Sequence, residues 1–446
     1  MKLRQMLMAA RLMAVAMVAS LMIGCASEPA KPAEADSAVK PVEFTGDPIK
    51  VGVLHSLSGT MAISETTLKD TILMMIEEQN KKGGLLGRKL EAVVVDPASD
   101  WPKFAEKAAQ LLEVDKVAVV FGCWTSVSRK SVLPVFEKDN GLLFYPVQYE
   151  GEESSKNVIY TGAAPNQQAI PAVDYLMGLG VKRWVLEGTD YVYPRTTNKI
   201  LEAYLLSKGV AAADISINYT PFGHSDWQTR VAAIKKFGAA GKKTAVVSTI
   251  NGDANVPFYK ELGNQKVSAE DIPVVAFSVG EEELSGVDTA PLVGHLAAWN
   301  YFQSVSTPEN TAFINQWKAY IKNPKRTTND PMEAHYIGFN LWVKAVEKAA
   351  TVDVEKVIEA LPGLETPNLT GGTAKLLANH HITKPVLIGE VRADGQFDVV
   401  KSIPSVEGDA WSDFLPASKN IDADWVTLKC GNYDKTTKKC SGQNYK

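Results

Sequence analysis

The sequence has few of the residues and motifs from which enzyme centres are usually built. Only four of its 446 residues are cysteine and six are histidine, and neither type shows the spacing of a metal site. A P-loop, a G-x-S-x-G elbow and a C-x-x-C pair are all missing, and no spacing singles out a catalytic triad. We therefore expect a binding protein with no catalytic residues, no metal and no cofactor.

The sequence also lacks an excess of basic residues. Lysine and arginine total 47 against 51 aspartate and glutamate, which gives a formal net charge of −4. Because nucleic-acid-binding domains usually carry a clustered basic surface, we expect no nucleic-acid partner. The 45% hydrophobic and 22% charged residues are typical of a globular protein, and the length indicates two lobes.

The first 25 residues have the pattern of an export signal. Basic residues precede an apolar run at 12–23, which is too short and wrongly flanked for a transmembrane helix. The run Met22-Ile23-Gly24-Cys25 resembles a bacterial lipobox, with Met22 in place of the usual leucine. In that interpretation Cys25 is lipidated and becomes the mature N-terminus; the alternative is an ordinary cleaved signal with an incidental cysteine.

Residues 26–47 are rich in alanine, glutamate, proline, lysine and serine. Such a segment cannot bury enough apolar surface to fold. We interpret it as a tether that holds the folded part beside a membrane, with a lipid anchor as the only membrane contact. The expected location is the periplasm or cell envelope.

The other three cysteines divide into a pair and a single residue. Cys430 and Cys440 bracket a turn-rich loop, and exported proteins form disulfides, so we predict a bridge between them; two free thiols are the alternative. Cys123 follows a predicted strand. We interpret it as a buried small residue rather than a reactive thiol.

Strands and helices alternate from residue 48 onward. Short apolar runs predict strands, and apolar residues at helical spacing predict the helices between them. This alternation is typical of a parallel, doubly wound α/β sheet. The predicted strands are 49–54, 90–95, 117–121 and 142–144, and the predicted helices are 60–82, 102–114 and 126–138.

The same alternation restarts after Pro165, so the fold class is α/β with two similar doubly wound, Rossmann-like lobes. A ligand site is expected in the cleft between them. From about 308 to 360 the chain is mainly helical, and 371–401 has the pattern of a hairpin. The predicted helices are 166–179, 194–208 and 226–237, and the predicted strands are 184–187, 215–219, 244–248 and 274–277.

Candidate ligand residues of the first lobe follow two predicted strands, 117–121 and 142–144. Ligands bind at the carboxyl ends of strands in open α/β sheets. Ser126 begins a predicted helix, where its N–H and hydroxyl can meet a ligand oxygen; the alternative is that Thr125 or Ser126 only caps the helix. Aromatic rings with one amide suit a small neutral polar molecule. The candidates are Trp124, Ser126, Tyr145, Gln148 and Tyr149.

Candidates of the second lobe follow strands 184–187 and 244–248. We expect one of Tyr191 and Tyr193 to face the cleft and choose Tyr191. Asn251 and Asp253 are the other candidates, since a carboxylate there can accept ligand N–H groups; the alternative for Asp253 is the N-cap of the next helix. The acidic run 281–283 is interpreted as a solvated first helical turn, with one residue able to line the cleft.

With these elements placed, the chain resembles the type I periplasmic solute-binding proteins of ABC transporters. Residues 49–59 and 80–90 are similar to the branched-chain amino acid receptor family. Segments 122–130, 145–151, 164–167 and 189–195 are similar to its branch for urea and short-chain amides. Trp124 and Val147-Gln148 depart from the amide sensors, which favours a changed ligand.

The resemblance implies an importer's receptor: it captures urea or a short-chain amide by closing two lobes about a hinge, and delivers it to a permease driven by an ATPase. It also implies lobes of 48–163 plus about 300–368, and 164–299 plus about 369–446. Three alternatives stay open. They are a branched-chain amino acid receptor, an amide sensor of the same fold and a surface amidohydrolase.

Overall fold

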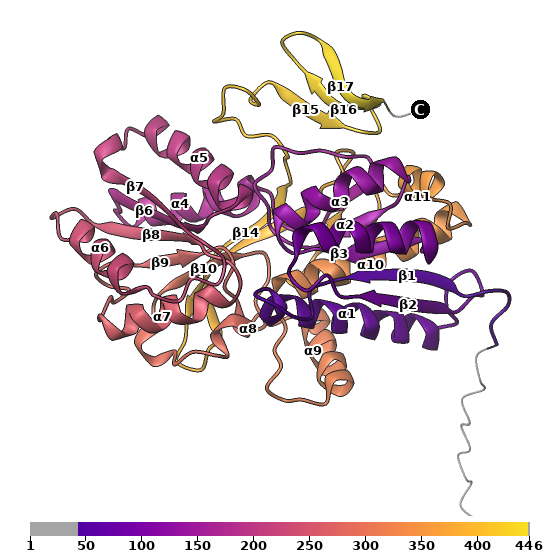
Figure 1. Ribbon diagram of the computed structural model, residues 1–446, viewed down its shortest axis with the longest axis horizontal. Helices are drawn as coiled ribbons and strands as arrows, with labels where there is room; N and C mark the ends of the chain where they lie inside the picture. The colour runs from indigo at the N-terminus through magenta and orange to yellow at the C-terminus, as the bar shows by residue number, and fades with distance from the viewer. Residues whose placement is uncertain (1–42, 445–446) are drawn as a thin grey trace, which may run out of the picture. The chain divides into compact units, whose positions relative to one another are not determined.

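The computed structural model of this chain describes residues 43–444. The predicted leader, the lipidation site Cys25 and the tether as far as residue 42 lie outside the described residues. Two large sheets and a small C-terminal sheet contain most of the strands (Figure 1). Within the part that the structure describes, we find no helix with both the length and the apolar character needed to cross a membrane.

The first sheet is wholly parallel, with strand order β2-β1-β3-β4-β5. Helices α1, α2 and α3 connect the first four strands in turn, and a loop connects β4 to β5. Because all five strands run parallel, their carboxyl ends share one edge of the sheet. Pro102 and Thr125 mark helix starts as the sequence predicts. The elements are β1 (Ile49–Leu54), α1 (Ala62–Lys81), β2 (Leu90–Val95), α2 (Trp101–Ala109), β3 (Val119–Gly122), α3 (Ser126–Lys138), β4 (Leu143–Tyr145) and β5 (Val158–Tyr160).

Late helices complete the first lobe, which we define as the first sheet with the helices packed on it. The long helix α10 packs against α1 and contacts β4. Its apolar residues, such as Phe339 and Trp342, are buried in the same core as Phe121. These helices are α9 (Pro308–Ile321), α10 (Asp330–Ala349) and α11 (Val354–Ala360), followed by the small hairpin β11 (Glu365–Pro367) and β12 (Thr373–Lys375).

The second sheet has the order β14-β13-β10-β9-β8-β6-β7 and defines the second lobe. Strands β6 to β10 run parallel, and β13 and β14 add an antiparallel hairpin at one edge. Its elements are α4 (Ala169–Gly178), β6 (Arg183–Thr189), α5 (Val192–Ser207), β7 (Ile215–Thr220), α6 (Gln228–Gly238), β8 (Thr244–Thr249), α7 (Asn255–Asn264), β9 (Val274–Ala276), α8 (Glu281–Leu284), β10 (Leu296–Trp299), β13 (Thr383–Val391) and β14 (Phe397–Glu407).

The structure confirms the predicted fold class of two doubly wound α/β sheets. Three sequence-based details differ. Strands β5 and β10 were not predicted, and the helix expected over 102–114 ends as a π-helical turn, Gln110–Val114. The C-terminal residues form a three-stranded antiparallel sheet of β15 (Ile421–Asp424), β16 (Cys430–Asp434) and β17 (Lys439–Asn444).

Three crossover segments join the lobes, and buried polar groups hold them together. The Asn300 amide donates to the carbonyl oxygens of Gln167 (3.0 Å) and Pro385 (2.5 Å), so one side chain ties all three segments. Lys384 is fully buried, with its Nζ 3.1 Å from both Glu333 Oε2 and the Thr161 carbonyl oxygen. Since motion of the lobes must turn these segments, this cluster lies at the expected hinge.

The lobe boundaries that we propose follow the buried cores. Residues Leu369 to Ile382 contribute to the core of the first lobe, whereas Leu387, Val391 and Phe397 contribute to that of the second. We therefore propose that the last crossover lies at about residue 383, later than the boundary of about 369 expected from the resemblance.

Candidate functional site

The end of β3 forms a tight turn that starts α3. Gly122 is required there, because a Cβ at this position would lie 2.4 Å from the Leu54 carbonyl oxygen of β1. Thr125 is the N-cap of α3, with its hydroxyl accepting the Ser128 N–H at 3.2 Å. The capping role thus belongs to Thr125, and the Ser126 hydroxyl is left to make a different contact.

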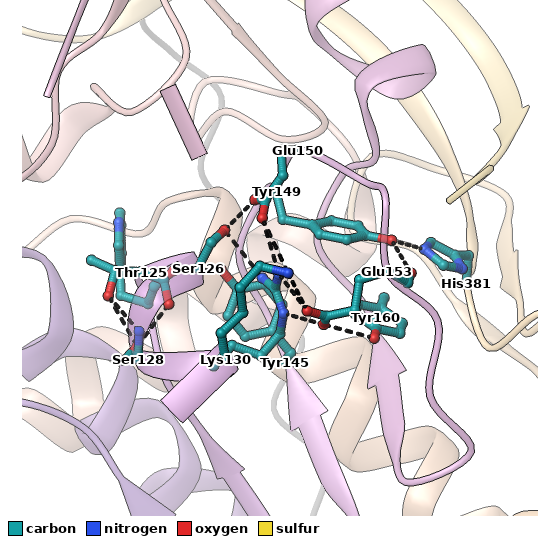
Figure 2. Close-up of polar contacts among 12 residues, drawn as sticks. Thr125, Ser126, Ser128, Lys130, Tyr145, Tyr149, Glu150, Glu153, Tyr160 and His381 are labelled. Atoms are coloured by element: carbon teal, nitrogen blue, oxygen red, sulfur yellow. Dashed lines mark hydrogen bonds and ion pairs between the residues drawn. The ribbon is translucent and has the colours of Figure 1, made fainter. Parts of the chain in front are cut away.

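Ser126, Arg129 and Glu150 form a buried polar cluster at the carboxyl edge of the first sheet. The Ser126 hydroxyl donates to Glu150 Oε2. Arg129 donates from Nη1 to Ser126 Oγ (3.2 Å), from Nη2 to Glu150 Oε1 (3.4 Å) and from Nε to Glu153 Oε1 (2.7 Å). Figure 2 shows Ser126 and Glu150 turned toward one another. These contacts join α3 to the loop that follows β4.

The charges of this cluster balance. Glu153 is paired with Arg129 and also accepts from Lys130 Nζ at 2.7 Å. Burial raises the pKa of Glu153, but the two cations outweigh burial and hold this pKa at about 2. The Glu150 and Glu153 carboxylates are thus matched by two cations. A full ligand charge of either sign would leave an uncompensated buried charge, so the cluster suits a neutral ligand.

Aromatic rings surround the Arg129 guanidinium. Its Cζ lies 4.7 Å from the ring centroids of both Tyr145 and Tyr149, at cation–π distance. The Tyr145 hydroxyl donates to the Trp124 carbonyl oxygen at 2.5 Å. The Tyr149 hydroxyl lies 2.6 Å from His381 Nε2 and points away from Ser126 (Figure 2). Tyr149 therefore serves as a wall that holds Arg129, rather than as a donor toward Ser126.

Two hydrogen bonds connect the lobes beside this cluster. Trp124 Nε1 donates to Asn251 Oδ1 at 3.3 Å, and Gln148 Nε2 donates to Ser278 Oγ at 2.6 Å. All four side chains are buried. The amide oxygen of Gln148, Oε1, is also buried but has no hydrogen-bond partner. Side chains of the two lobes therefore touch directly here.

Tyr191 and Tyr193 both approach the cluster from the second lobe. Tyr191 is the N-cap residue of α5, and its ring packs 4.8 Å from that of Phe222. Burial raises the pKa of Tyr191, and the nearby Tyr145 and Glu150 raise it further. Tyr193 is 2% exposed, and its hydroxyl has no hydrogen-bond partner. Sequence reasoning chose Tyr191 alone, whereas the structure brings both residues to this region.

The remaining candidates of the second lobe lie in different surroundings. Asn251 is buried, and its Nδ2 donates to the Thr249 carbonyl oxygen at 3.0 Å, which fixes its amide toward Trp124. The Asp253 side chain is exposed, in the first turn of a short 3-10 helix. Its backbone N–H donates to the Thr60 carbonyl oxygen at 3.2 Å. The structure thus brings six of the eight ligand candidates to this region. Asp253 is exposed, and the Tyr149 hydroxyl faces away.

The interpretation of the acidic run 281–283 as a solvated helical turn is wrong for two of its three residues. Glu281 and Glu283 are each 2% exposed. Glu283 Oε1 accepts from the Ser64 hydroxyl at 2.7 Å, which links α8 to α1 across the lobes, and Glu281 Oε1 accepts the Gln303 N–H at 2.6 Å. Burial raises the pKa of Glu281 to about 8.

Sequence reasoning missed four residues of the site: Arg129, Glu150, Glu153 and Ser278. Arg129 lies one helical turn after Ser126, so the spacing placed both on one face of α3. The two glutamates are three residues apart in the loop after β4, where charged residues are usually solvated. Two carboxylates there, with an arginine on the preceding helix, were the available signal.

The cysteines and possible metal ligands complete the inventory. The structure joins Cys430 and Cys440 in a disulfide, and Cys123 is a buried free thiol whose pKa is raised by burial. Across residues 43–444 we find no group of three or more histidine, cysteine or acidic side chains arranged to hold a metal ion.

A sequence profile for the family described as "Periplasmic binding protein domain" matches residues 49–417. The chain belongs to this family. The curated relatives that match most of its length are named as branched-chain amino acid-binding proteins. Membership of this family implies a periplasmic location.

Relatives and solved structures agree on the fold. A Leu/Ile/Val-binding protein homolog from Brucella melitensis is 24% identical over 81% of this chain and 92% of its own length. A leucine-, isoleucine-, valine-, threonine- and alanine-binding protein from Pseudomonas aeruginosa is 24% identical over 73% of this chain and 85% of its own. A solute-binding protein from R. palustris, solved with 4-hydroxybenzoate, has a TM-score of 0.71 at 20% identity and covers 82% of this chain and 99% of its own. The chain has the type I periplasmic binding protein fold.

Proposed function

We propose that this chain captures urea, or a short-chain amide, between its lobes and delivers it to an ABC permease. The observation that carries this proposal is the buried, charge-balanced cluster of Ser126, Arg129 and Glu150, opposite unpaired polar atoms of Gln148 and Tyr193. It supplies hydrogen-bonding capacity without net charge.

Urea has one carbonyl oxygen and four N–H groups on a flat frame. Each group left unpaired after burial costs about 1–3 kcal/mol, so a specific site must answer all of them. Glu150 and the free Gln148 Oε1 can accept N–H groups, since a carboxylate oxygen has lone pairs beyond those used by Ser126 and Arg129. The free Tyr193 hydroxyl can donate to the carbonyl oxygen. Trp124, Tyr145 and Tyr191 supply the walls.

Asn251 fixes the position of the Trp124 indole, and Tyr149 fixes that of Arg129. In this proposal Asn251 and Tyr149 do not contact the ligand; each positions a neighbouring side chain, Trp124 or Arg129. Asp253, which the sequence also offered as a ligand residue, would have to turn inward from its exposed position. Capture consists of a population shift toward the closed form about the crossover segments.

The second candidate is a branched-chain amino acid receptor, which the names of the curated relatives favour. An amino acid brings a carboxylate and an ammonium group, and the carboxylate needs a free cation or a set of free donors. In the cluster described here, Arg129 is committed to Glu150, Glu153 and Ser126. The structure therefore offers a better match to a neutral amide.

We further propose that Cys25 carries a lipid anchor and that residues 26–42 form a tether to it. The expected end at residue 47 is too late, because the Thr45 N–H donates to the Gly87 carbonyl oxygen at 2.7 Å and Arg88 Nε donates to the Asp47 carbonyl oxygen at 2.6 Å. The export signal and lipobox pattern support this assignment. Mass spectrometry of the protein purified from membranes tests it: a diacylglycerol-modified Cys25 as the first residue is expected. An unmodified chain that begins elsewhere would contradict it.

Calorimetric titration of the chain from residue 26 tests the ligand. Urea, acetamide, leucine and 4-hydroxybenzoate are titrated separately into the same preparation. We expect saturable binding of urea ahead of the other three compounds. Clear binding of leucine without urea would replace the proposal with the second candidate, and ammonia released from urea would point to hydrolysis instead.

A further inference from the structure

The C-terminal sheet β15–β17 is an addition to the family fold. The family profile ends at residue 417, and this sheet begins at Ile421. It is hydrogen-bonded to neither large sheet and stands apart from both in Figure 1. The disulfide Cys430–Cys440 links β16 to β17. Its contacts with the rest of the chain therefore indicate its role.

One tryptophan attaches this sheet to the loop that carries Glu150 and Glu153. Trp425 is 3% exposed, and its indole Nε1 donates to Ser154 Oγ at 3.0 Å. Its backbone N–H donates to the Ala378 carbonyl oxygen at 3.0 Å. Gly431 of β16 packs directly on the indole, since a Cβ there would lie 2.5 Å from the ring. The disulfide-linked sheet thus packs against the Trp425 indole through Gly431.

The segment before the sheet holds the same loop from a second side. The Glu152 N–H donates to the Ala410 carbonyl oxygen at 2.5 Å, and Glu152 Oε1 accepts the Ser412 N–H at 3.0 Å. Gly151 has a φ of +68°, and a Cβ there would lie 2.5 Å from the Ala410 oxygen. The loop and this segment therefore fit together at van der Waals contact.

Two buried histidines extend the connection to the aromatic wall. The His380 ring lies 6.0 Å from the Trp425 ring. His381 Nδ1 lies 2.9 Å from the Asn379 carbonyl oxygen, so it carries the hydrogen, and Nε2 accepts from the Tyr149 hydroxyl at 2.6 Å. The His381 ring also stacks on Tyr160 at 4.7 Å. Tyr149 in turn packs on Arg129, the partner of Glu150.

We propose that residues 408–444, with their disulfide, are a positioning element for the ligand loop 149–155. Trp425 is its positioning residue, and His381, which lies before this segment, holds Tyr149. Neither residue touches the ligand. The role in ligand affinity rests on the proposed function of Glu150 as a ligand group. The role in holding the loop does not depend on what the ligand is.

Hydrogen exchange of the chain from residue 26, without ligand, tests the structural part. The variants are Trp425→Ala, Trp425→Phe and the pair Cys430→Ser with Cys440→Ser. We expect exchange at the Glu152 amide to rise roughly tenfold or more in Trp425→Ala and in the paired serine variant, while amides of β8 in the second lobe keep their wild-type rates. Trp425→Phe keeps the packed ring and restores most of the protection.

Titration of the same variants with urea tests the functional part. Affinity for urea is expected to fall about tenfold in Trp425→Ala, because a loop that is no longer held in place must be ordered when the ligand binds. Affinity should recover in Trp425→Phe, which holds the loop again. Unchanged exchange at Glu152 in both disrupted variants would overturn the proposal, as would an equal rise at β8. If the wild type binds no urea, the proposed function fails, and the exchange result still decides the positioning role.

Discussion

The two lobes contribute very different surfaces to the same site. The first lobe presents charged groups that are already paired without a ligand. Glu150 accepts hydrogen bonds from Ser126 and Arg129, and Arg129 also donates to Glu153. The second lobe presents only neutral groups near the site, and the Tyr193 hydroxyl has no partner. In the proposed function, the first lobe sets the chemistry of the ligand and the second lobe completes its hydrogen bonds on closure.

The largest expected effect breaks the charge balance of the first lobe. Arg129→Met leaves Glu150 and Glu153 buried without their main cation, which costs about 3–5 kcal/mol of unfolding free energy. Guanidinium unfolding followed by circular dichroism measures it. The control Arg195→Met removes an exposed pair with Asp190 in the second lobe and should leave the midpoint nearly unchanged. Equal effects of the two variants would contradict the contrast.

Two buried glutamates, one in each lobe, should respond oppositely to pH. Glu153 of the first lobe has a lowered pKa of about 2, so its stabilising contribution is present above its unfolded pKa of about 4.5 and is lost as pH falls toward 2. Glu281 of the second lobe has a raised pKa of about 8. Its protonated form therefore stabilises the fold below pH 4.5, and this contribution is lost as pH rises through 8.

Glu281→Gln isolates the second of these responses. The variant lacks the ionisable group, so it should avoid a loss of about 2–4 kcal/mol between pH 4.5 and 8. Thermal melts across this range compare it with the wild type. Parallel pH profiles of the two proteins above pH 4.5 would show that Glu281 titrates normally and would remove this difference between Glu281 and Glu153.

A smaller effect is expected on ligand affinity from Glu150→Gln. The change keeps the shape of the side chain but removes the charge from the hydrogen bond that Glu150 accepts from urea. A charge-assisted hydrogen bond is worth about 1.5–3 kcal/mol, so Kd should rise about 10- to 100-fold. Calorimetry with urea measures it. Asp253→Asn in the second lobe is the matched control, and its exposed side chain predicts an unchanged Kd. A loss with Asp253→Asn alone would reverse the assignment of the two carboxylates.

The smallest expected effect concerns Tyr193→Phe. Because the Tyr193 hydroxyl is buried without a partner, its removal should leave the stability of the ligand-free protein equal or slightly higher. Urea affinity should nevertheless fall about fivefold, by about 1 kcal/mol, because the hydroxyl finds its partner only in the complex. A drop in ligand-free melting temperature without a change in affinity would assign the hydroxyl to the fold instead.

Local patterns in the sequence were sufficient to predict most of the fold. Apolar runs such as 49–54 and helical spacing in 126–138 act within a few residues, and the structure places elements there. Strand β10 was not predicted, and its place in the sheet is defined by its neighbours β9 and β13. The C-terminal sheet likewise depends on packing by Trp425 and on a disulfide.

The candidate site was less predictable because its key contacts are long-range. Strand ends pointed to Trp124, Ser126 and Gln148, since parallel strands bring their carboxyl ends together. Nothing in the local sequence shows that Arg129 pairs with Glu150, or that Gln148 meets Ser278, which lies 130 positions away. The burial of Glu281 and Glu283 depends in the same way on a helix from the other lobe.

A crystal structure of the chain with urea would test the central claim most directly. The account predicts urea between the lobes, with a nitrogen about 3 Å from a Glu150 carboxylate oxygen and Arg129 still paired to Glu153. A bound amino acid whose carboxylate draws Arg129 away from the two glutamates would contradict it. So would urea bound only at the surface, with the Ser126–Glu150 contact untouched.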